Sequence, residues 1–323
     1  MTRFSTIAVV AGALGAVLLV AAMRQSLFGV MLGAMLSPLP LAMAVLGLGV
    51  NFLPLAVVSG AITVMVLTGS LAMASVYLVM DAAPVALLSQ LRRFAEPGKN
   101  GLTVSGAAIG RLVCWLVLSA AVALVIGLSV FPSGPDGIEA ALQEQLKDVL
   151  AAVTATTAAT QGGEGTAEAR DQMLRVLAGI LPAAVAVHLC LRAILSTGLA
   201  QIALSRMQLA QGLAPDYRQF AVPTWFVAPA GALVALALVA TGDVGFVAAS
   251  AAAVLSLPLA LQGLAVVHCA VAQTRQRIVL LVVFYILALL MASVTAVMLV
   301  TVGVVEQFYE IRARHFATRT GGK

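Results

Sequence analysis

The sequence predicts an all-α fold, a polytopic bundle of transmembrane helices, and two observations support that prediction. Hydrophobic residues make up 62% of the chain and charged residues only 10%, against about 25% charged residues in soluble domains. The apolar residues also occur in long runs, and about 20 of them are needed to cross the hydrocarbon core of a bilayer. A soluble chain of 323 residues could not solvate so much apolar surface. We therefore expect residues 1–323 to form a single polytopic membrane domain.

Eight or nine of these apolar runs are predicted to cross the membrane as helices. The second run contains Pro38 and Pro40, which remove backbone donors and should kink or divide its helix. The first run could also be a secretory signal, but its length favours a retained span. The runs are Thr6–Met23, Ser26–Val50, Phe52–Thr68, Leu71–Leu91, Gly106–Phe131, Leu174–Leu195 with an extension toward Gln211, Thr224–Ala240, Val244–Val267 and Ile278–Val304.

Basic residues in short loops predict the orientation, because Lys and Arg accumulate on the cytoplasmic side of a membrane. We expect the N-terminus to lie on that side of a bacterial inner membrane. Nine crossings would export the basic tail around Arg312 and Arg314, which the same rule disfavours. Either the Pro38 segment or the last run is then re-entrant, which leaves eight crossings. The basic residues on the expected cytoplasmic side are Arg3, Arg92, Arg93, Lys99, Arg206, Arg218, Arg275 and Arg277.

An acidic loop over residues 132–172 is expected on the exported side. Within it, apolar residues recur at helical spacing opposite charged ones, which predicts an amphipathic helix. This helix either covers an external opening or connects two spans with its apolar face on lipid. The stretch Thr154–Thr166, rich in Ala, Thr and Gly, is typical of a flexible linker. The apolar positions are Ile138, Leu142, Leu146, Val149, Leu150 and Val153.

Small residues at four-residue spacing predict where helices approach each other, since helices in lipid associate by close packing. Such patterns arise easily in a chain this rich in Ala and Gly. We therefore expect them to pack within the bundle rather than to form a dedicated partner face. The stripes are Ala8, Gly12 and Ala16, then Gly29 and Gly33, then Gly106 and Gly110.

Several chemistries find no support in the sequence. Cys114, Cys190 and Cys269 lie in apolar runs without CxxC spacing or clustered histidines, so neither a disulfide framework nor a metal site is predicted. The patterns HExxH, GxSxG and GxxxxGK[ST] do not occur, so we expect no catalytic residue, no cofactor and no ATPase in this chain. The net charge of +5 is spread beside apolar runs, which favours membrane orientation over nucleic-acid binding.

Polar residues inside the predicted spans are candidate ligand-binding residues, because an ionisable group near the bilayer centre costs about 2.5–3.5 kcal/mol and needs a partner or water. Asp81 lies in mid-span, shortly before Pro84, which frees a carbonyl nearby. Asp81 would bind a cation, a proton or an amine, or would form a structural ion pair. His188 and Arg192 share one helix face and would hold an anion, unless Arg192 reaches the interface or neutralises Asp81.

A further candidate segment combines Gln262, Gly263 and His268 within one predicted span. A helix that only crosses the membrane needs none of these three features: an amide side chain, a glycine that permits close helix approach, and an imidazole. The histidine could equally be a satisfied packing residue. A ligand site and a scaffold therefore both remain open at this segment.

Four segments carry a resemblance to a known group. They are PLPLAMAVLGLGVNFLPLA over Pro38–Ala56, LQGLAVVH over Leu261–His268, the pair Phe284 and Tyr285, and VGVVEQFYEIRAR over Val302–Arg314. With these residues the chain resembles the YybS-like predicted membrane proteins, an uncharacterised bacterial family. Glu306 stands where an Asp is commoner in that family, and the substitution keeps the charge.

The resemblance implies an architecture similar to the substrate-binding membrane subunits of energy-coupling-factor vitamin transporters and to the rod-shape protein MreD. Three hypotheses for the function follow from the sequence, and the third, an intramembrane enzyme, has no catalytic motif to support it. The first is a solute-binding transport subunit whose partner ATPase supplies energy. The second is a structural or assembly protein of the cell envelope that works through partner contacts. In the first, the solute would lie near Asp81, His188, Arg192, Gln262 and His268.

Overall fold

The computed structural model describes residues 3–23, 35–98, 101–132, 134–157, 167–207 and 217–316. The contacts between residues divide the chain into two units. Unit 1 comprises Met1–Leu116, Leu189–Pro223 and Pro258–Lys323, and unit 2 comprises Val117–His188 and Thr224–Leu257. The expectation of one polytopic domain stays a prediction.

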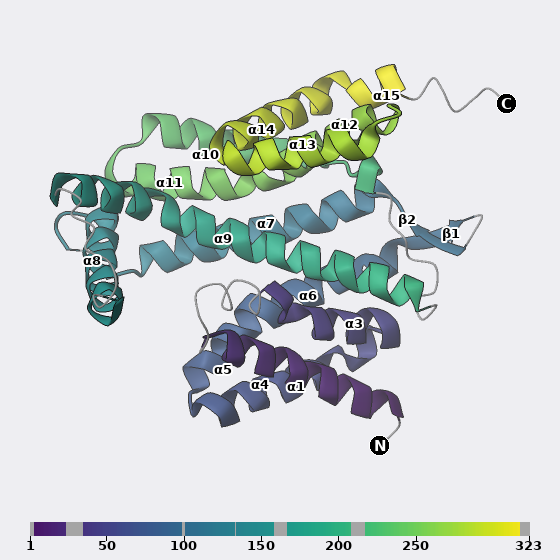
Figure 1. Ribbon diagram of the computed structural model, residues 1–323, viewed down its shortest axis with the longest axis horizontal. Helices are drawn as coiled ribbons and strands as arrows, with labels where there is room; N and C mark the ends of the chain where they lie inside the picture. Colours follow the sequence, from purple (N-terminus) through teal and green to yellow (C-terminus); the bar gives the residue numbers. More distant parts are fainter. Residues whose placement is uncertain are drawn as a thin grey trace. The chain divides into compact units, whose positions relative to one another are not determined.

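Helices make up nearly all of the described chain, as the sequence predicts (Figure 1). Each predicted run contains at least one apolar helix. Within the described residues, 7 helical segments are long and apolar enough to cross a membrane: Arg3–Met23, Val50–Thr68, Leu71–Leu91, Gly106–Ser129, Arg170–Arg206, Gly242–Ala272 and Ala292–Tyr309. Three shorter apolar helices accompany them: α3 (Pro38–Leu48), α10 (Thr224–Val239) and α13 (Arg277–Leu290).

The N-terminal part of unit 1 is a group of short and long helices that ends in a small hairpin. Pro38 begins α3, so the break expected at the prolines of this segment is present. The strands β1 (Ala95–Gly98) and β2 (Gly101–Val104) pair antiparallel after the last helical turn, a feature that the sequence analysis did not predict. The helices are α1 (Arg3–Met23), α3, η1 (Val50–Phe52), α4 (Leu53–Thr68), α5 (Leu71–Tyr77), η2 (Leu78–Ala82), α6 (Ala83–Leu88) and η3 (Ser89–Phe94).

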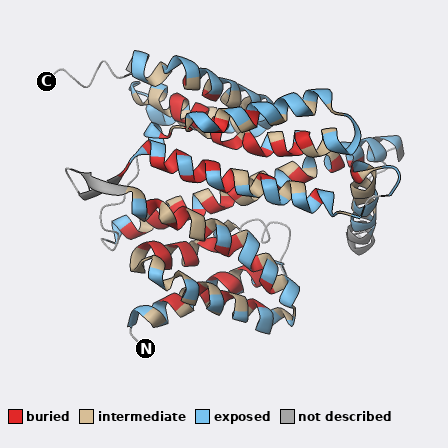
Figure 2. Ribbon diagram, turned by 180° about the vertical axis from the view of Figure 1, so that it is seen from behind, coloured by how far each residue is buried: buried red, intermediate tan, exposed pale blue. Residues whose placement is uncertain are grey.

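Small residues hold this group together. Ala8, Gly12 and Ala16 are all buried along α1, which packs against α3 and α4. A Cβ built on Gly12 would overlap the carbonyl oxygen of Ala56 in α4, so the two backbones lie in direct contact. Figure 2 shows the buried residues gathered where these helices face each other. The prediction that this stripe packs within the bundle is confirmed.

The stripe of Gly106 and Gly110 packs against the segment 219–221 rather than against a long helix. It lies in α7 (Gly106–Ser129), and Cβ atoms built on the two glycines would overlap the carbonyl oxygens of Gln219 and Ala221. The Ala221 N–H donates to the Gly106 carbonyl at 3.4 Å. The remaining pair, Gly29 and Gly33, lies outside the described residues.

Unit 2 contains a helix within the acidic stretch 132–172, and the amphipathic character expected of it stays a prediction. This helix is α8 (Ile138–Thr157), and the Asp243 carboxylate of α11 (Gly242–Leu255) accepts a hydrogen bond from the first α8 amide, Ile138 N, at 2.8 Å. A carboxylate at a helix N-terminus satisfies a free N–H and complements the helix dipole. The placement of α8 on a membrane surface stays a prediction, and residues 158–166 of the expected linker lie outside the described residues. The unit also contains α10 and parts of α7 and α9 (Ala167–Arg206).

The C-terminal part of unit 1 corrects the last predicted run. The single helix expected over Ile278–Val304 is wrong, because the chain turns at Met291 (φ −120°, ψ 47°) between α13 and α14 (Ala292–Tyr309). Ser293, Val294 and Thr295 follow the turn, and β-branched and hydroxyl-bearing residues are weak helix formers. Both halves contact α12 (Leu257–Ala272), and the three helices lie side by side in Figure 1. The chain thus folds back into a helical hairpin before α15 (Ile311–Phe316).

The crossing of α12 and α14 requires two glycines. A Cβ built on Gly263 would overlap the Leu299 carbonyl oxygen, and a Cβ built on Gly303 would overlap the Leu259 carbonyl oxygen. Each glycine therefore lets the opposite backbone approach without an intervening side chain.

We expect Gly263→Ala to lower the thermal stability of the protein in mild detergent. The added methyl group meets a backbone atom that cannot move aside, and overpacking of this kind costs about 1–3 kcal/mol. Gly127→Ala is the matched control, since a Cβ at Gly127 in α7 meets nothing within 4 Å. Equal melting temperatures for the two variants would show that the α12–α14 crossing is looser than described.

Candidate functional site

Asp81 lies in an irregular helical turn. It belongs to η2, a π-helical turn between α5 and α6, and π-helical turns occur frequently at functional sites. Pro84 lacks the N–H that would bond to the carbonyl four residues earlier, that of Met80. The Arg192 guanidinium of α9 donates to that oxygen at 2.8 Å. Pro84 thus leaves the Met80 carbonyl free to accept a hydrogen bond from Arg192, which is distant in the sequence.

Arg192 and Asp81 form a buried ion pair. Arg192 Nη2 donates to Asp81 Oδ1, and Ser37 Oγ donates to Asp81 Oδ2 at 2.9 Å. The Asp81 side chain is fully buried and the Arg192 side chain is 4% exposed. Ser196, one turn after Arg192, donates to the Met35 carbonyl at 3.0 Å. The pair therefore joins three parts of unit 1, the start of α3, η2 and α9, and both carboxylate oxygens have protein partners.

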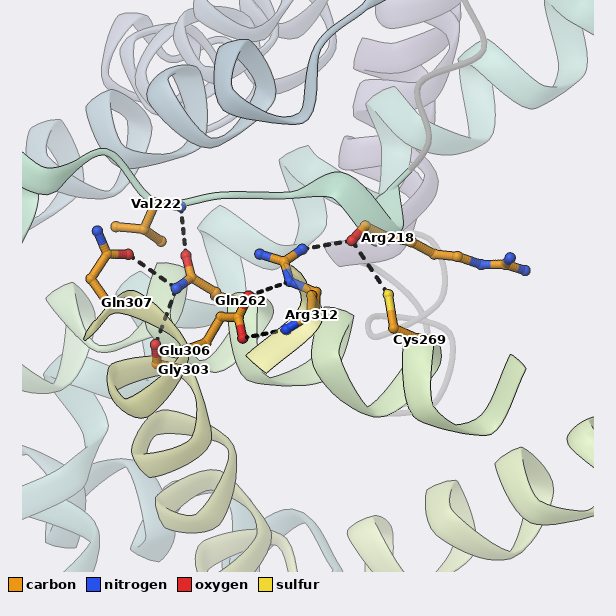
Figure 3. A network of polar contacts seen from close by, with 8 residues as sticks. All are labelled: Arg218, Val222, Gln262, Cys269, Gly303, Glu306, Gln307 and Arg312. Atoms are coloured by element: carbon orange, nitrogen blue, oxygen red, sulfur yellow. Dashed lines mark hydrogen bonds and ion pairs between the residues drawn. The ribbon is translucent and has the colours of Figure 1, made fainter. Parts of the chain in front are cut away.

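Gln262 is the centre of a second buried polar cluster (Figure 3). Its Oε1 accepts from Val222 N at 2.6 Å. Its Nε2 donates to the Gly303 carbonyl at 3.1 Å and to Gln307 Oε1 at 3.0 Å. One amide side chain thus connects α12, α14 and the extended segment after η4 (Tyr217–Gln219).

Glu306 and Arg312 extend this cluster to the chain end of α14 (Figure 3). Glu306 accepts from Arg312 Nε at 2.7 Å and from Arg312 N at 3.2 Å. Arg312 Nη1 donates to the Arg218 carbonyl at 2.6 Å, and the Cys269 thiol lies 3.7 Å from the same oxygen. The beginning of α15, the loop at Arg218 and the last turn of α12 therefore meet at one end of the helices.

Unit 1 contains a cavity of about 500 Å³ among α7, α9, the η4 segment, α12 and α13. Its volume lies within the range of roughly 300–1,000 Å³ that is usual for small-molecule sites. Its polar lining residues are Tyr217, Arg218, His268 and Tyr285. Its apolar wall consists of Ile109, Val113, Ile194, Leu195, Leu199, Ile202, Phe220, Leu261, Leu264 and Ala265.

The polar residues of the cavity are held by their own hydrogen bonds. His268 Nδ1 lies 2.9 Å from the Leu264 carbonyl, and His268 Nε2 lies 3.2 Å from the Tyr285 hydroxyl. The Tyr217 hydroxyl donates to Gln201 Oε1 at 3.1 Å, close above Gly198, whose missing side chain leaves room for it. Although the Tyr217 ring is partly exposed, burial of this end raises the pKa of Tyr217 above its ordinary value, so the phenol stays protonated.

The structure separates the five predicted site residues into different environments. Asp81 and Arg192 contact each other, which is the ion pair that the sequence offered as an alternative to a ligand site. Gln262 lies in the polar cluster at the α12–α14 crossing, and His268 lines the cavity. His188 shares a face of α9 with Arg192 but belongs to unit 2. The expectation that these residues hold a solute stays a prediction.

Sequence reasoning missed the tyrosines of the cavity as site residues. In the sequence, Tyr285 belongs only to the segments that carry the family resemblance. Tyr217 lies in the loop after the predicted span Leu174–Leu195 and its extension toward Gln211. A phenol between apolar residues has no spacing signature of its own, so only the fold shows that Tyr285 contacts His268 and that Tyr217 contacts Gln201 of α9.

Comparison with known proteins identifies one family. The family model described as "Predicted membrane protein (DUF2232)" matches residues 13–306. No curated protein and no solved structure shows a significant match to the chain. The resemblances to YybS-like proteins, to vitamin-transporter subunits and to MreD stay predictions.

Arg192→Met should destabilise the purified protein strongly. The substitution leaves the Asp81 carboxylate buried without its counter-charge, and removal of one partner of a buried pair costs about 3–5 kcal/mol. The double variant Asp81→Asn with Arg192→Met removes the orphaned charge and keeps a partner for Ser37. Thermal unfolding in one detergent should therefore show the double variant to be more stable than Arg192→Met alone. The reverse order would contradict the ion pair.

Proposed function

We propose that this chain, which belongs to the DUF2232 family of predicted membrane proteins, binds a small molecule within the bilayer as the solute-binding subunit of a transporter. One observation carries the proposal, the cavity of about 500 Å³ in unit 1. A largely apolar cavity with a few converging polar groups is the usual form of a small-molecule site.

The arrangement of the cavity supports a binding role. Side chains from four helices and a loop line it, so a ligand would contact segments that are far apart in the chain. His268 and Tyr217 are each fixed by a hydrogen bond to the protein, so these groups need little ordering when a ligand arrives. Of the residues predicted from the sequence, the proposal keeps His268 in the site. It assigns Asp81, Arg192 and Gln262 to the scaffold.

The proposed subunit has no energy source of its own. The Walker pattern GxxxxGK[ST] is absent from the sequence, so a separate ATPase subunit would drive transport. The proposal is of a binding protein rather than an enzyme, and it needs no metal or cofactor. Its environment would be the bacterial inner membrane.

A second function, a structural or assembly protein of the envelope, is favoured by a different observation. Asp81 and Arg192 pair with each other, and both ends of the Gln262 amide form hydrogen bonds within the chain. Such internal satisfaction is what a rigid scaffold requires. Under this alternative the cavity would stay empty and the protein would act through partner contacts.

The orientation of the chain also belongs to the proposal. Arg312 contacts the Arg218 carbonyl, so the C-terminal helix begins at the same end as the loop that follows α9. The folded-back pair α13 and α14 supports this, because a helical hairpin returns the chain to the side it left. Basic residues gather at Arg206, Arg218 and Arg275, which makes this the cytoplasmic side.

A ligand screen tests the binding function. The full chain is purified in mild detergent and its thermal stability is measured with vitamins, amino acids, metal ions and apolar alcohols. A true ligand at a hundredfold its Kd should stabilise the fold by about 2.7 kcal/mol. Leu199→Trp should abolish the effect, because the larger indole ring would occupy the cavity that Leu199 lines. Leu199 is 48% exposed, so the fold should tolerate the larger side chain.

The matched control is Leu236→Trp in α10, which changes a leucine of similar exposure, 42%, outside the cavity. It should retain the stabilisation. If no compound stabilises the protein while envelope proteins co-purify with it, the scaffold function replaces the binding function. If both tryptophan variants still respond, the ligand binds elsewhere.

Reporter fusions test the orientation. A fluorescent protein fused after the C-terminus should fluoresce in the cytoplasm, because the Arg312 contact places that end with the Arg218 loop. A phosphatase fused after Asp136 should be active outside the membrane, while the same phosphatase after Arg93 should be inactive. An active phosphatase at the C-terminus would refute this orientation.

A further inference from the structure

The hydrogen bonds of the cavity have a fixed direction. The Leu264 carbonyl oxygen can only accept, so His268 Nδ1 donates to it at 2.9 Å. A neutral imidazole that donates at one nitrogen accepts at the other. With His268 neutral and protonated at Nδ1, the Tyr285 hydroxyl therefore donates to His268 Nε2 at 3.2 Å. This leaves the Tyr285 oxygen with lone pairs and without a proton to give.

Tyr217 repeats this pattern on the other side of the cavity. Its hydroxyl proton is donated to Gln201 Oε1 at 3.1 Å, so its oxygen also keeps acceptor capacity. The two phenols thus present acceptors to a bound molecule. A carboxylate has only acceptors and would form no hydrogen bond with either phenol, so it would have to bind at the Arg218 guanidinium instead. A hydroxyl supplies the proton that both phenol oxygens lack.

The walls of the cavity indicate where such a molecule comes from. Leu195, Leu199 and Ile202 line the cavity and are 50%, 48% and 48% exposed. They lie on α9, a helix apolar and long enough to cross the membrane. The edge of the cavity is therefore bordered by side chains that would contact lipid tails. A molecule dissolved in the bilayer reaches this edge without passing through water.

We infer that the ligand is an uncharged, lipid-soluble molecule bearing a hydroxyl group, which enters from the bilayer and donates that hydroxyl to the Tyr285 oxygen. The inference rests on the proposed binding function and narrows it to one class of solute. It predicts selectivity for an alcohol over an ether of the same length, because the ether has an acceptor but no donor.

The experiment uses the full chain in lipid nanodiscs and a dodecanol carrying a photoactivatable diazirine. After illumination, the labelled residues are located by mass spectrometry. We expect labels on residues 194–202 of α9 and 261–268 of α12. Unlabelled 1-dodecanol should compete about tenfold better than methyl dodecyl ether or dodecanoate, as expected for the loss of one hydrogen bond in the site.

Tyr285→Phe keeps the ring and removes the acceptor, so labelling of these residues should fall about tenfold. Tyr309→Phe is the control, since Tyr309 lies on α14 outside the cavity, with its ring centroid 4.4 Å from the Arg314 guanidinium. It should label as the wild type does.

Three results would overturn the inference. Equal competition by the ether and the alcohol would remove the donor requirement. Unchanged labelling of Tyr285→Phe would remove the assigned acceptor. A water-soluble compound could instead stabilise the protein, lose this effect with Leu199→Trp and resist displacement by dodecanol. That result would leave the binding function intact but assign it another class of solute. If neither water-soluble compounds nor alcohols bind, the binding function itself fails.

Discussion

The close crossing of α12 and α14 at Gly263 and Gly303 is the contact on which the C-terminal part of unit 1 depends. Helices surrounded by lipid gain little from covering apolar surface, so close backbone approach and interhelical hydrogen bonds hold them together. The two glycines bring the backbones into contact, and Gln262 can then reach both the Gly303 carbonyl and Val222 N. This fixes Val222 and, through the adjoining η4 turn and Phe220, the segment that brings Tyr217 and Phe220 to the cavity wall. Packing, the polar cluster and the cavity therefore form one connected arrangement.

Polar residues inside the spans serve two different purposes in this chain. Asp81 is the residue that an insertion cost of about 2.5–3.5 kcal/mol would single out as functional. Yet Arg192 and Ser37 occupy both of its carboxylate oxygens, and the proline-freed Met80 carbonyl accepts from the same arginine. His268 is less conspicuous by charge, but it lines a space large enough for a ligand. A cavity beside a polar group therefore distinguishes the candidate site from the scaffold better than charge does.

The sequence predicted the features whose residues recur at regular spacing along the chain. The stripe of Ala8, Gly12 and Ala16 was recognisable because helical spacing places small residues on one face, and it packs inside the bundle. The Asp81–Arg192 pair could be offered only as one alternative, because spacing along a chain does not show contact between residues 111 positions apart. The turn at Met291 was missed because apolar residues continue through it, so hydropathy carries no mark of the reversal. Tyr217 and Tyr285 were missed as site residues because their role depends on that same reversal and on the loop after α9.

The weak attachment of α13 agrees with its place at the cavity. None of its residues is buried, although Tyr285 from this helix forms part of the cavity lining. An element with few buried contacts opens at a lower free-energy cost than the core around it. The hydrogen bond between Tyr285 and His268 ties α13 to α12, and α12 is itself held by the glycine crossing and by Gln262. A wall of this kind can move while its neighbours stay fixed, which is what a site that admits molecules from the bilayer requires.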